Sequence, residues 1–242
     1  MMIIFYDQID STNRIAKELA AEGKPSGTVV RAAVQSAGRG QYGRSFSSPL
    51  GGLYFSLLLV PDLPIETLPL ITLATGLACR DVLHRDFNLH PLIKWPNDLY
   101  LDGKKVAGIL CENVLIPGVP ATVIIGVGLN VNNTIEDFAV ELQPIITTLF
   151  EFLHRTVELA PLLIRLTQAI TGQVERLRYD QASLLAEWQQ FDFLFQKPVV
   201  HGQEGETLHG IGQGVSSRGL YRILDENGVE HQLIGGQLRP RA

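Results

Sequence analysis

The chain has 242 residues, of which 45% are hydrophobic and 19% are charged, a composition that excludes a disordered or fibrous protein. This length fits one large domain, or a larger domain with a small one attached. The formal net charge of -5 excludes a strongly basic protein, so we expect neither nucleic acid nor an anionic membrane as a partner.

Strands and helices alternate over the first part of the chain. A helix is predicted over residues 10–23, with Asp10 or Ser11 at its N-cap and Gly23 at its end. Asp102 and Gly103 form a type I′ hairpin signal. The other predicted elements are strands at 3–8, 28–35, 52–60 and 121–132, a helix over 67–87, and a strand and hairpin within 91–114.

The pattern changes twice in the second half of the chain. It is helical from about residue 145 to 190. After Lys197 and Pro198 come short strands at turn spacing, with a further hairpin signal at Asn227–Gly228. We therefore predict an α/β (α+β) domain over residues 1–195 and a small all-β barrel over 196–242.

Nothing in the sequence indicates secretion or membrane insertion. The longest apolar stretch, at 51–60, is shorter than the roughly 20 residues that span a bilayer, and the N-terminus has no basic signal-peptide region. Cys79 and Cys111 have neither disulfide-framework nor zinc spacing. We expect a cytoplasmic protein.

A glycine-rich segment with two arginines, GRGQYGR at residues 38–44, follows the predicted strand 28–35. It matches G-x-G-x-x-G, but a dinucleotide-binding turn must open a helix, and Pro49, Gly51 and Gly52 forbid one here. Two interpretations remain: an anion-binding loop, or a surface turn with solvated arginines.

A kinase interpretation of the same segment also fails. The sequence HRD at 84–86 would need an Asn five residues after its Asp, and that position is Pro91. The HRD residues are then an ordinary polar helix end.

Other segments favour a functional site. Lys94, Trp95, Asn97 and Asp98 gather a cation, an aromatic ring and polar groups around one turn between apolar strands. Glycines inside the later strands indicate close approach by a ligand or by another backbone.

The motifs DSTN, QSAGRGQYGR, SPLGGLYFSL, KWPNDLYLDGKKVAGIL and IGVGLNVN occur in this order between about Tyr6 and Asn132. This ordered set resembles the biotin protein ligases. The terminal segments GIGQGVSSRGLY and GGQLRPR are similar to the C-terminal SH3-like barrel of that family. The resemblance implies a catalytic domain with a mixed sheet of the class II synthetase type. It also implies the monofunctional type, without an N-terminal DNA-binding domain.

The resemblance implies a two-step reaction. Biotin and ATP form biotinyl-5′-AMP and pyrophosphate, and a lysine of a biotin carboxyl carrier protein then displaces AMP. Such adenylation depends on positioning and electrostatics rather than on an enzyme nucleophile. Mg²⁺ is expected with ATP, although the sequence does not name its ligands. The family often pairs edge strands of the catalytic sheet, so the resemblance also implies a homodimer.

The resemblance also implies roles for individual residues. The catalytic cations are Arg39 and Lys94. The biotin-binding residues are Ser11, Thr12, Asn13, Gln35, Gly38, Arg39, Gly40, Gln41, Lys94, Gly108, Gly126 and Gly128. The ATP-binding residues are Arg39, Arg44, Phe46, Trp95, Asn97 and Asn130.

Two positions depart from the family pattern. Gln41 stands where many members have Arg, and Phe46 where they usually have Trp beside the adenine. Phe offers a smaller ring for stacking, and Gln41 removes one cation from the loop. We therefore expect weaker retention of the adenylate.

Two alternatives stay open on the sequence. A lipoate–protein ligase shares the catalytic fold, although the loop and KWPND motifs match the biotin branch. A biotin-sensing or partner-docking module would bind without catalysis, and it would tolerate loss of Arg39 and Lys94.

Overall fold

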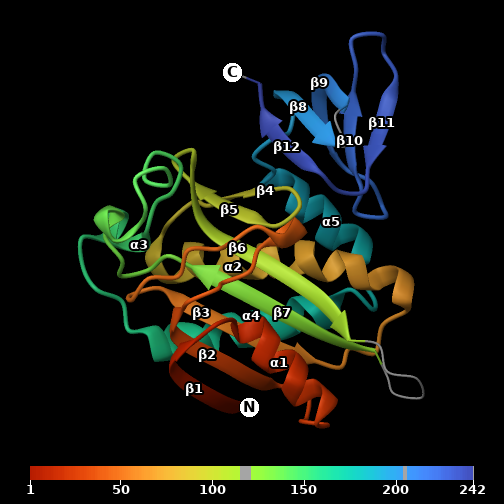
Figure 1. Ribbon diagram of the computed structural model, residues 1–242. Helices are drawn as coiled ribbons and strands as arrows, with labels where there is room; N and C mark the ends of the chain where they lie inside the picture. Colours follow the sequence, from red (N-terminus) through yellow and green to blue (C-terminus); the bar gives the residue numbers. More distant parts are fainter. Residues whose placement is uncertain (115–120, 204–205, 242) are drawn as a thin grey trace.

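The computed structural model describes residues 1–114, 121–203 and 206–241, so residues 204–205 and 242 of the predicted second domain lie outside it (Figure 1). The larger part is a seven-stranded mixed sheet in the order β1-β2-β3-β7-β6-β5-β4. Only β1 and β2 pair in parallel, while all other neighbours in this sheet are antiparallel. Its strands are β1 (Met2–Ile9), β2 (Thr28–Gln35), β3 (Leu53–Leu59), β4 (Leu92–Lys94), β5 (Asp98–Leu101), β6 (Lys104–Val114) and β7 (Thr122–Leu129).

Helices cover the two faces of this sheet unequally. The helix α1 (Thr12–Ala21) packs on β2, β3 and β7 on one face, near the N-terminus. The opposite face is covered by α2 (Ile71–Phe87) and α4 (Leu159–Arg176), which pack on each other. The remaining helical segments are α3 (Leu149–Leu153), α5 (Gln181–Gln190) and the 3₁₀ turns Gln41–Gly43, Ile65–Leu70 and Ile135–Asp137.

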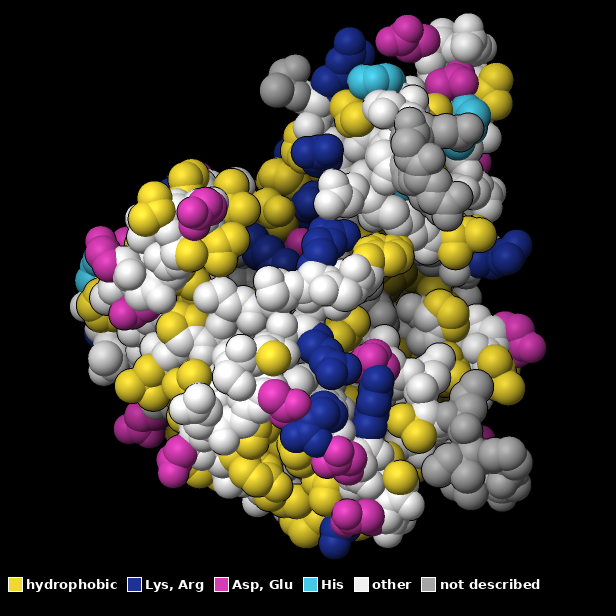
Figure 2. Space-filling view, viewed as in Figure 1, with side chains coloured by type: hydrophobic (Ala, Val, Ile, Leu, Met, Phe, Trp, Pro, Cys, Tyr) yellow, Lys and Arg dark blue, Asp and Glu magenta, His cyan; other side chains and the backbone are white. Residues whose placement is uncertain are grey.

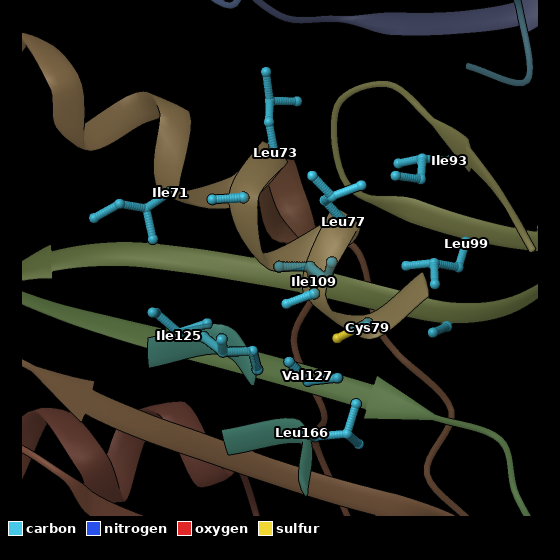
Figure 3. Packing of buried hydrophobic residues seen from close by; sticks show 14 of the residues in the cluster. Ile71, Leu73, Leu77, Cys79, Ile93, Leu99, Ile109, Ile125, Val127 and Leu166 are labelled. Carbon is cyan, nitrogen blue, oxygen red and sulfur yellow. The ribbon is translucent and has the colours of Figure 1, made fainter. Parts of the chain in front are cut away.

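The alternation of β7 explains this division. Ile125 and Val127 point into the main core toward α2, where they lie near Leu77 and Ile109 (Figure 3). Because successive strand residues face opposite sides, Gly126 and Gly128 face the other way. On that face α1 covers only part of the sheet, which leaves the surface above the two glycines for a cavity.

A second sheet follows α5, with the strand order β11-β10-β9-β8-β12 and antiparallel pairing throughout. In Figure 1 it stands apart from the large sheet, next to α5. No ladder joins its outer strands β11 and β12 in the described residues, so a closed barrel is not confirmed. Its strands are β8 (Pro198–Gln203), β9 (Glu206–Val215), β10 (Tyr221–Leu224), β11 (Glu230–Leu233) and β12 (Gln237–Pro240).

Buried side chains join the two sheets. The Trp95 indole donates to the Gly219 carbonyl at 3.1 Å and packs beside the Tyr221 ring. The Tyr221 hydroxyl donates to Asp192 Oδ2 at 2.8 Å, and the Leu194 amide donates to Asp192 Oδ1. Burial raises the pKa of Asp192 to about 6. These contacts fix the second sheet against the end of β4.

The predicted elements agree with this structure except at some ends. Asp102 and Gly103 both have positive φ, as the predicted type I′ turn requires. The strand predicted over 121–132 ends at Leu129, because Asn130 and Asn132 turn away to bond other segments. The helical region predicted from residue 145 begins only at Leu149 and is divided into three helices. Among the described residues, no helix combines the length and the apolar character that a membrane crossing requires.

Candidate active site

A cavity of about 130 Å³ lies where the N-terminal turn of α1 meets β6, β7 and the arginine loop, residues 38–46. We refer to it as the central cavity. Its inner end is polar and its mouth is cationic. Its lining is Ser11, Thr12, Asn13, Gln35, Arg39, Gly40, Gln41, Arg44, Ser45, Phe46, Asn97, Asp98, Lys105, Gly108, Ile109, Leu110, Gly126, Val127 and Gly128.

The inner end holds a continuous hydrogen-bond network around Thr12. The Thr12 amide and hydroxyl both donate to Gln35 Oε1, at 2.8 and 3.1 Å. Gln35 Nε2 in turn donates to Ser48 Oγ at 2.8 Å. Ser11 is the N-cap residue of α1, but its side chain makes no capping hydrogen bond, so the predicted capping role is filled only by its backbone. The first turn of the helix is therefore held by the sheet rather than by its own cap.

Asn13 continues this network toward the edge of the cavity. Its Oδ1 lies 2.5 Å from Ser56 Oγ, and its Nδ2 donates to Glu112 Oε2 at 2.8 Å. Glu112 also pairs with Lys17. With both ends of its amide bonded and only 4% of its surface exposed, Asn13 is held in one orientation.

The glycines of β6 and β7 give room to side chains of this same chain. A Cβ atom on Gly126 would lie 2.1 Å from Asn13 Oδ1, and one on Gly128 would lie 2.4 Å from the Phe46 ring. A Cβ on Gly108 would lie 2.9 Å from the same ring. Contacts below 3 Å cannot be accommodated without movement. The space predicted for a ligand above these glycines is thus partly filled by Asn13 and Phe46 in this conformation.

The arginine loop is a narrow hairpin rather than an irregular strand connection. The Phe46 amide donates to the Gly38 carbonyl at 2.8 Å, and the Gly40 amide donates to the Arg44 carbonyl at 2.7 Å. A Cβ on Gly38 would meet the Phe46 carbonyl at 2.4 Å, so Gly38 has a packing role below the cavity lining. The structure opens no α-helix after the loop, in agreement with the exclusion of a dinucleotide turn.

Positive charge gathers at the mouth of the central cavity. Figure 2 shows dark blue side chains clustered in the hollow between the two parts of the molecule. Arg39 and Arg44 are exposed there, and within the described residues neither has an ion pair. Lys105 lies deeper and pairs with Asp98 at 2.6 Å. The mouth therefore carries more cationic than anionic side chains, which suits an anionic ligand.

Lys94 lies beside the central cavity rather than in its wall. It lines an adjoining cavity of about 190 Å³, here called the cationic cavity, which also contains Arg44, Asp98 and Arg239. Burial lowers the pKa of Lys94, and the nearby cations lower it further while Asp98 opposes them. Trp95 contributes to the same wall, but its indole is buried against the second sheet, as described above.

A third cavity, of about 170 Å³, lies on the other side of Phe46 and is here called the apolar cavity. The Phe46 ring belongs to the linings of both this and the central cavity. Asn130 donates to the Thr147 carbonyl at 3.0 Å, which leaves its buried Oδ1 without a partner in the described residues. Asn97 lines the central and cationic cavities, and its Nδ2 donates to the Ile109 carbonyl at 2.7 Å.

Sequence reasoning missed Lys105 and Ser56. Strand alternation counted back from Gly108 puts Lys105 on the opposite face, but a bulge at Val106 reverses it and returns the Lys105 ammonium to within 3.2 Å of a Cβ position on Gly108. Ser56 could have been found, because it is the only hydroxyl-bearing residue besides Tyr54 in the fully buried strand β3. A buried hydroxyl needs a partner, and here the partners are Thr12 and Asn13.

The sequence profile of the biotin/lipoate A/B protein ligase family matches residues 5–130. The chain belongs to this family. It is 38% identical over 230 residues to the bifunctional ligase/repressor BirA of Bacillus subtilis, an alignment that covers 94% of this chain and 71% of the relative.

Two further relatives agree with this assignment. The chain is 30% identical over 219 residues to the biotin–[acetyl-CoA-carboxylase] ligase of Mycobacterium tuberculosis, covering 88% of this chain and 79% of the relative. The biotin protein ligase of Aquifex aeolicus, solved in complex with biotin and ATP, is 28% identical with a TM-score of 0.87, and 99% of each chain is covered. The similarity to this family member therefore includes both sheets.

Proposed function

We propose that this ligase-family chain activates biotin with ATP to give biotinyl-5′-AMP, and then transfers biotin to a lysine of a biotin carboxyl carrier protein. The observation that carries the proposal is the central cavity, which has a fixed polar network at its inner end and cations at its mouth. Biotin has the matching polarity, with a polar ureido ring at one end and a carboxylate at the other. The binding of biotin and ATP by the Aquifex relative supports the same assignment.

The inner network suits the ureido ring. Ser11, Thr12, Asn13 and Gln35 offer amide and hydroxyl groups on rigid backbone, and Gln41 closes the loop side. The ring would take the space beside Gly108, Gly126 and Gly128, with Gly40 in the cavity lining and Gly38 packed below it against Phe46. Since Asn13 is already bonded on both sides, it supplies shape and polarity with little loss of side-chain entropy on binding.

The cations at the mouth suit the reacting groups. The biotin carboxylate and the α-phosphate are both negative, so their approach needs neutralisation. Arg39, Lys94 and Lys105 surround the position where these groups would meet, and Arg44 lies toward the polyphosphate in the cationic cavity. A carboxylate oxygen of biotin attacks the α-phosphorus, and the bond from this phosphorus to the pyrophosphate oxygen breaks.

The second step needs no nucleophile from this chain. The amine of the carrier lysine attacks the acyl carbon of the adenylate, the acyl–oxygen bond breaks, and AMP leaves with the electron pair. The resulting amide nitrogen loses one proton to solvent. The chain contributes by holding the mixed anhydride at an open face beside the arginine loop.

The apolar cavity suits the adenine base. Phe46 offers an aromatic face, and Asn130 Oδ1 is a buried acceptor whose unfilled capacity matches the exocyclic amino group of adenine. Asn97 lies between the central and cationic cavities, toward the ribose and phosphates. Trp95 acts indirectly, because its buried indole positions the backbone of Lys94.

Mg²⁺ fits this site through Asp98. Mg²⁺ usually takes one or two protein carboxylates and completes its shell with phosphate oxygens and water. Among the residues that the structure describes, Asp98 is the one carboxylate in the linings of the central and cationic cavities. Among the described ranges no cluster of three His, Cys, Asp or Glu residues could form a cage for the ion. The ion would neutralise charge on the polyphosphate, and Asp98 would hold it there.

Further features belong to the same proposal. We divide the chain at residues 1–195 and 196–242, and the five short antiparallel strands of the second sheet support an SH3-like type. A homodimer is supported by the edge strand β1, where Ile3 and Phe5 are exposed. The cytoplasmic location and the lack of a nucleic-acid partner stay predictions.

A transfer assay tests the function directly. The full chain is incubated with ATP, Mg²⁺, a biotin carboxyl carrier domain and either biotin or lipoate, and the carrier mass and released pyrophosphate are measured. We expect biotin-dependent pyrophosphate release and a biotinylated carrier. Arg39→Ala should reduce both by about 100-fold or more, as for other groups that stabilise transition-state charge. Transfer of lipoate alone would instead select the other branch, and binding of biotin without pyrophosphate release would select the non-catalytic module.

A further inference from the structure

The tip of the arginine loop contacts the second sheet through Tyr42. The Gly236 amide donates a hydrogen bond to the Tyr42 hydroxyl oxygen at 2.8 Å. The contact is close on both sides of this bond, because a Cβ on Gly235 would lie 2.0 Å from the same oxygen. Residues 194 positions apart in the sequence therefore meet at the rim of the active site.

The glycine pair is fixed from the opposite side by a buried histidine. His201 on β8 bonds the Gly235 carbonyl through Nε2 at 2.7 Å. A Cβ on Gly236 would lie 2.3 Å from that nitrogen, and Gly236 has a φ of +100°. Gly235 and Gly236 are thus packed between the Tyr42 hydroxyl and the His201 ring. The turn between β11 and β12 gives the loop a rigid point of attachment.

Tyr42 needs such an attachment. Its backbone is left-handed, with φ 57° and ψ 34°, a conformation that bulky side chains rarely adopt. Tyr42 is 65% solvent-exposed, so burial does not hold its side chain in place. The bond from Gly236 is the hydrogen bond of the Tyr42 hydroxyl among the described residues, while the Arg44 guanidinium of the same loop lies over the ring, 5.7 Å from its centroid. The contact therefore supports a strained loop tip.

We propose that Tyr42 is a positioning residue, which ties the arginine loop to the second sheet and so holds Arg39 and Arg44 over the cavity mouths. Tyr42 itself lines neither the central nor the cationic cavity, whereas its loop neighbours Gln41 and Arg44 line both. Release of the tip would let these neighbours move away from the mouth. The structural part of the proposal stands on the contact alone, and its catalytic consequence rests on the proposed function.

Limited proteolysis of the full chain without substrates tests the structural part. Trypsin cleaves after Arg39 and Arg44, which are exposed in the loop. Tyr42→Phe should raise the cleavage rate about fivefold, the change expected for loss of one ordinary hydrogen bond. Tyr179→Phe is the matched control, because Tyr179 is 79% exposed on the turn before α5. Trypsin cleavage of free peptides of residues 36–48, with and without Tyr42→Phe, measures how the change alters the intrinsic cleavage rate of the sequence. The rates for the full chain are corrected by this difference.

The reciprocal variant is Gly235→Ala, whose new methyl group would displace the Tyr42 hydroxyl. It should raise loop cleavage as Tyr42→Phe does. In the double variant the hydroxyl is absent, and the ring atom nearest to the new methyl group is Tyr42 Cζ at 3.3 Å. Small shifts accommodate this contact, so the second change should add little to the cleavage rate. Unchanged cleavage in Tyr42→Phe, or fully additive effects in the double variant, would overturn the tether.

Adenylate retention tests the catalytic consequence. After a single turnover with biotin and ATP, Tyr42→Phe should lose adenylate to solution about fivefold faster than the parent chain. Faster cleavage combined with unchanged adenylate loss and unchanged pyrophosphate release would overturn the positioning role. If the parent chain releases no pyrophosphate, the proposed function has failed, and the cleavage experiment still decides whether the tether exists.

Discussion

Asn13 Oδ1 occupies the position that a side chain on Gly126 would need, since a Cβ there would lie only 2.1 Å away. Asn13 stands on the first turn of α1 and Gly126 in the middle of β7. The contact sets the depth of the central cavity at its inner end, and it explains a glycine at this buried position of the strand.

Gly126→Ala should therefore raise the KM for biotin by about tenfold or more, because Asn13 must leave its bonds to Ser56 and Glu112. Gly172→Ala is the matched control. Gly172 lies in α4 with no atom within 4 Å of its Cβ position, so that change should stabilise the protein by about 0.5–1 kcal/mol and leave the KM unchanged. Steady-state kinetics and thermal unfolding measure both effects. An unchanged KM for biotin in Gly126→Ala would show that the position of Asn13 does not affect biotin binding.

Lys105→Met should lower the rate of pyrophosphate release by about 10- to 100-fold, because it removes a cation from the central cavity. It also leaves Asp98 without its ion-pair partner, which adds local negative charge. Lys104→Met changes the exposed neighbouring lysine and should stay within about twofold, as expected for a surface position. Equal losses in the two variants would indicate an effect of overall charge.

Phe46→Ala should weaken ATP binding by about 5- to 100-fold, the range expected for loss of base stacking on an aromatic ring. The ring also separates the central cavity from the apolar cavity, so biotin affinity should fall to a smaller extent. Isothermal titration with each substrate measures both affinities. Phe46→Trp, which enlarges the ring, should preserve ATP binding. A larger loss for biotin than for ATP would contradict the adenine assignment.

Gln41→Arg should slow the loss of adenylate from the protein by about threefold to tenfold, because a further cation would face the anionic intermediate. Gln41 lines both the central and the cationic cavity, so a longer cationic side chain reaches either. Gln41→Met, of similar length and uncharged, separates charge from size. An unchanged loss rate in Gln41→Arg would show that Gln41 does not limit retention.

The buried Asp192 should make stability depend on pH. Its pKa is raised to about 6 in the folded protein, so between about pH 4 and 6 the folded state binds more protons than the unfolded state. The free energy of unfolding therefore decreases through this window as pH rises. Asp192→Asn removes the titration, and from pH 4 to 7 its stability should rise relative to the parent by roughly 1–3 kcal/mol. Urea unfolding at both pH values measures this, and a constant difference would contradict it.

Much of the fold followed from local patterns. The capping region of α1, the Asp102–Gly103 turn and the alternation of β7 are each encoded within a few residues. The arrangement of Lys105 was not predictable in this way, because the bulge at Val106 depends on pairing with β5. The Tyr42 contact was equally inaccessible, since nothing near Tyr42 in the sequence indicates Gly236.

The site residues show the same difference between features encoded locally and features that depend on distant elements. The motifs placed Ser11, Thr12, Asn13 and Gln35 at one end of a cavity that the structure also forms. Trp95 differed, because its neighbours in sequence suggested a ligand, whereas its indole is buried against Tyr221 and Gly219. A sequence pattern identifies a polar cluster, but the packing of distant elements decides which way a large ring turns.

The lining of the cationic cavity comes from segments far apart in the sequence, with Arg44 on the arginine loop and Arg239 on β12. During synthesis, the large sheet can form before β12 has left the ribosome, because all of its strands, β1 to β7, precede residue 130. A nascent chain at that stage would have the polar inner end of the site without its complete mouth. The site should therefore gain its complete mouth only after the second sheet has folded, so full activity depends on a segment that is synthesised long after the inner end of the site.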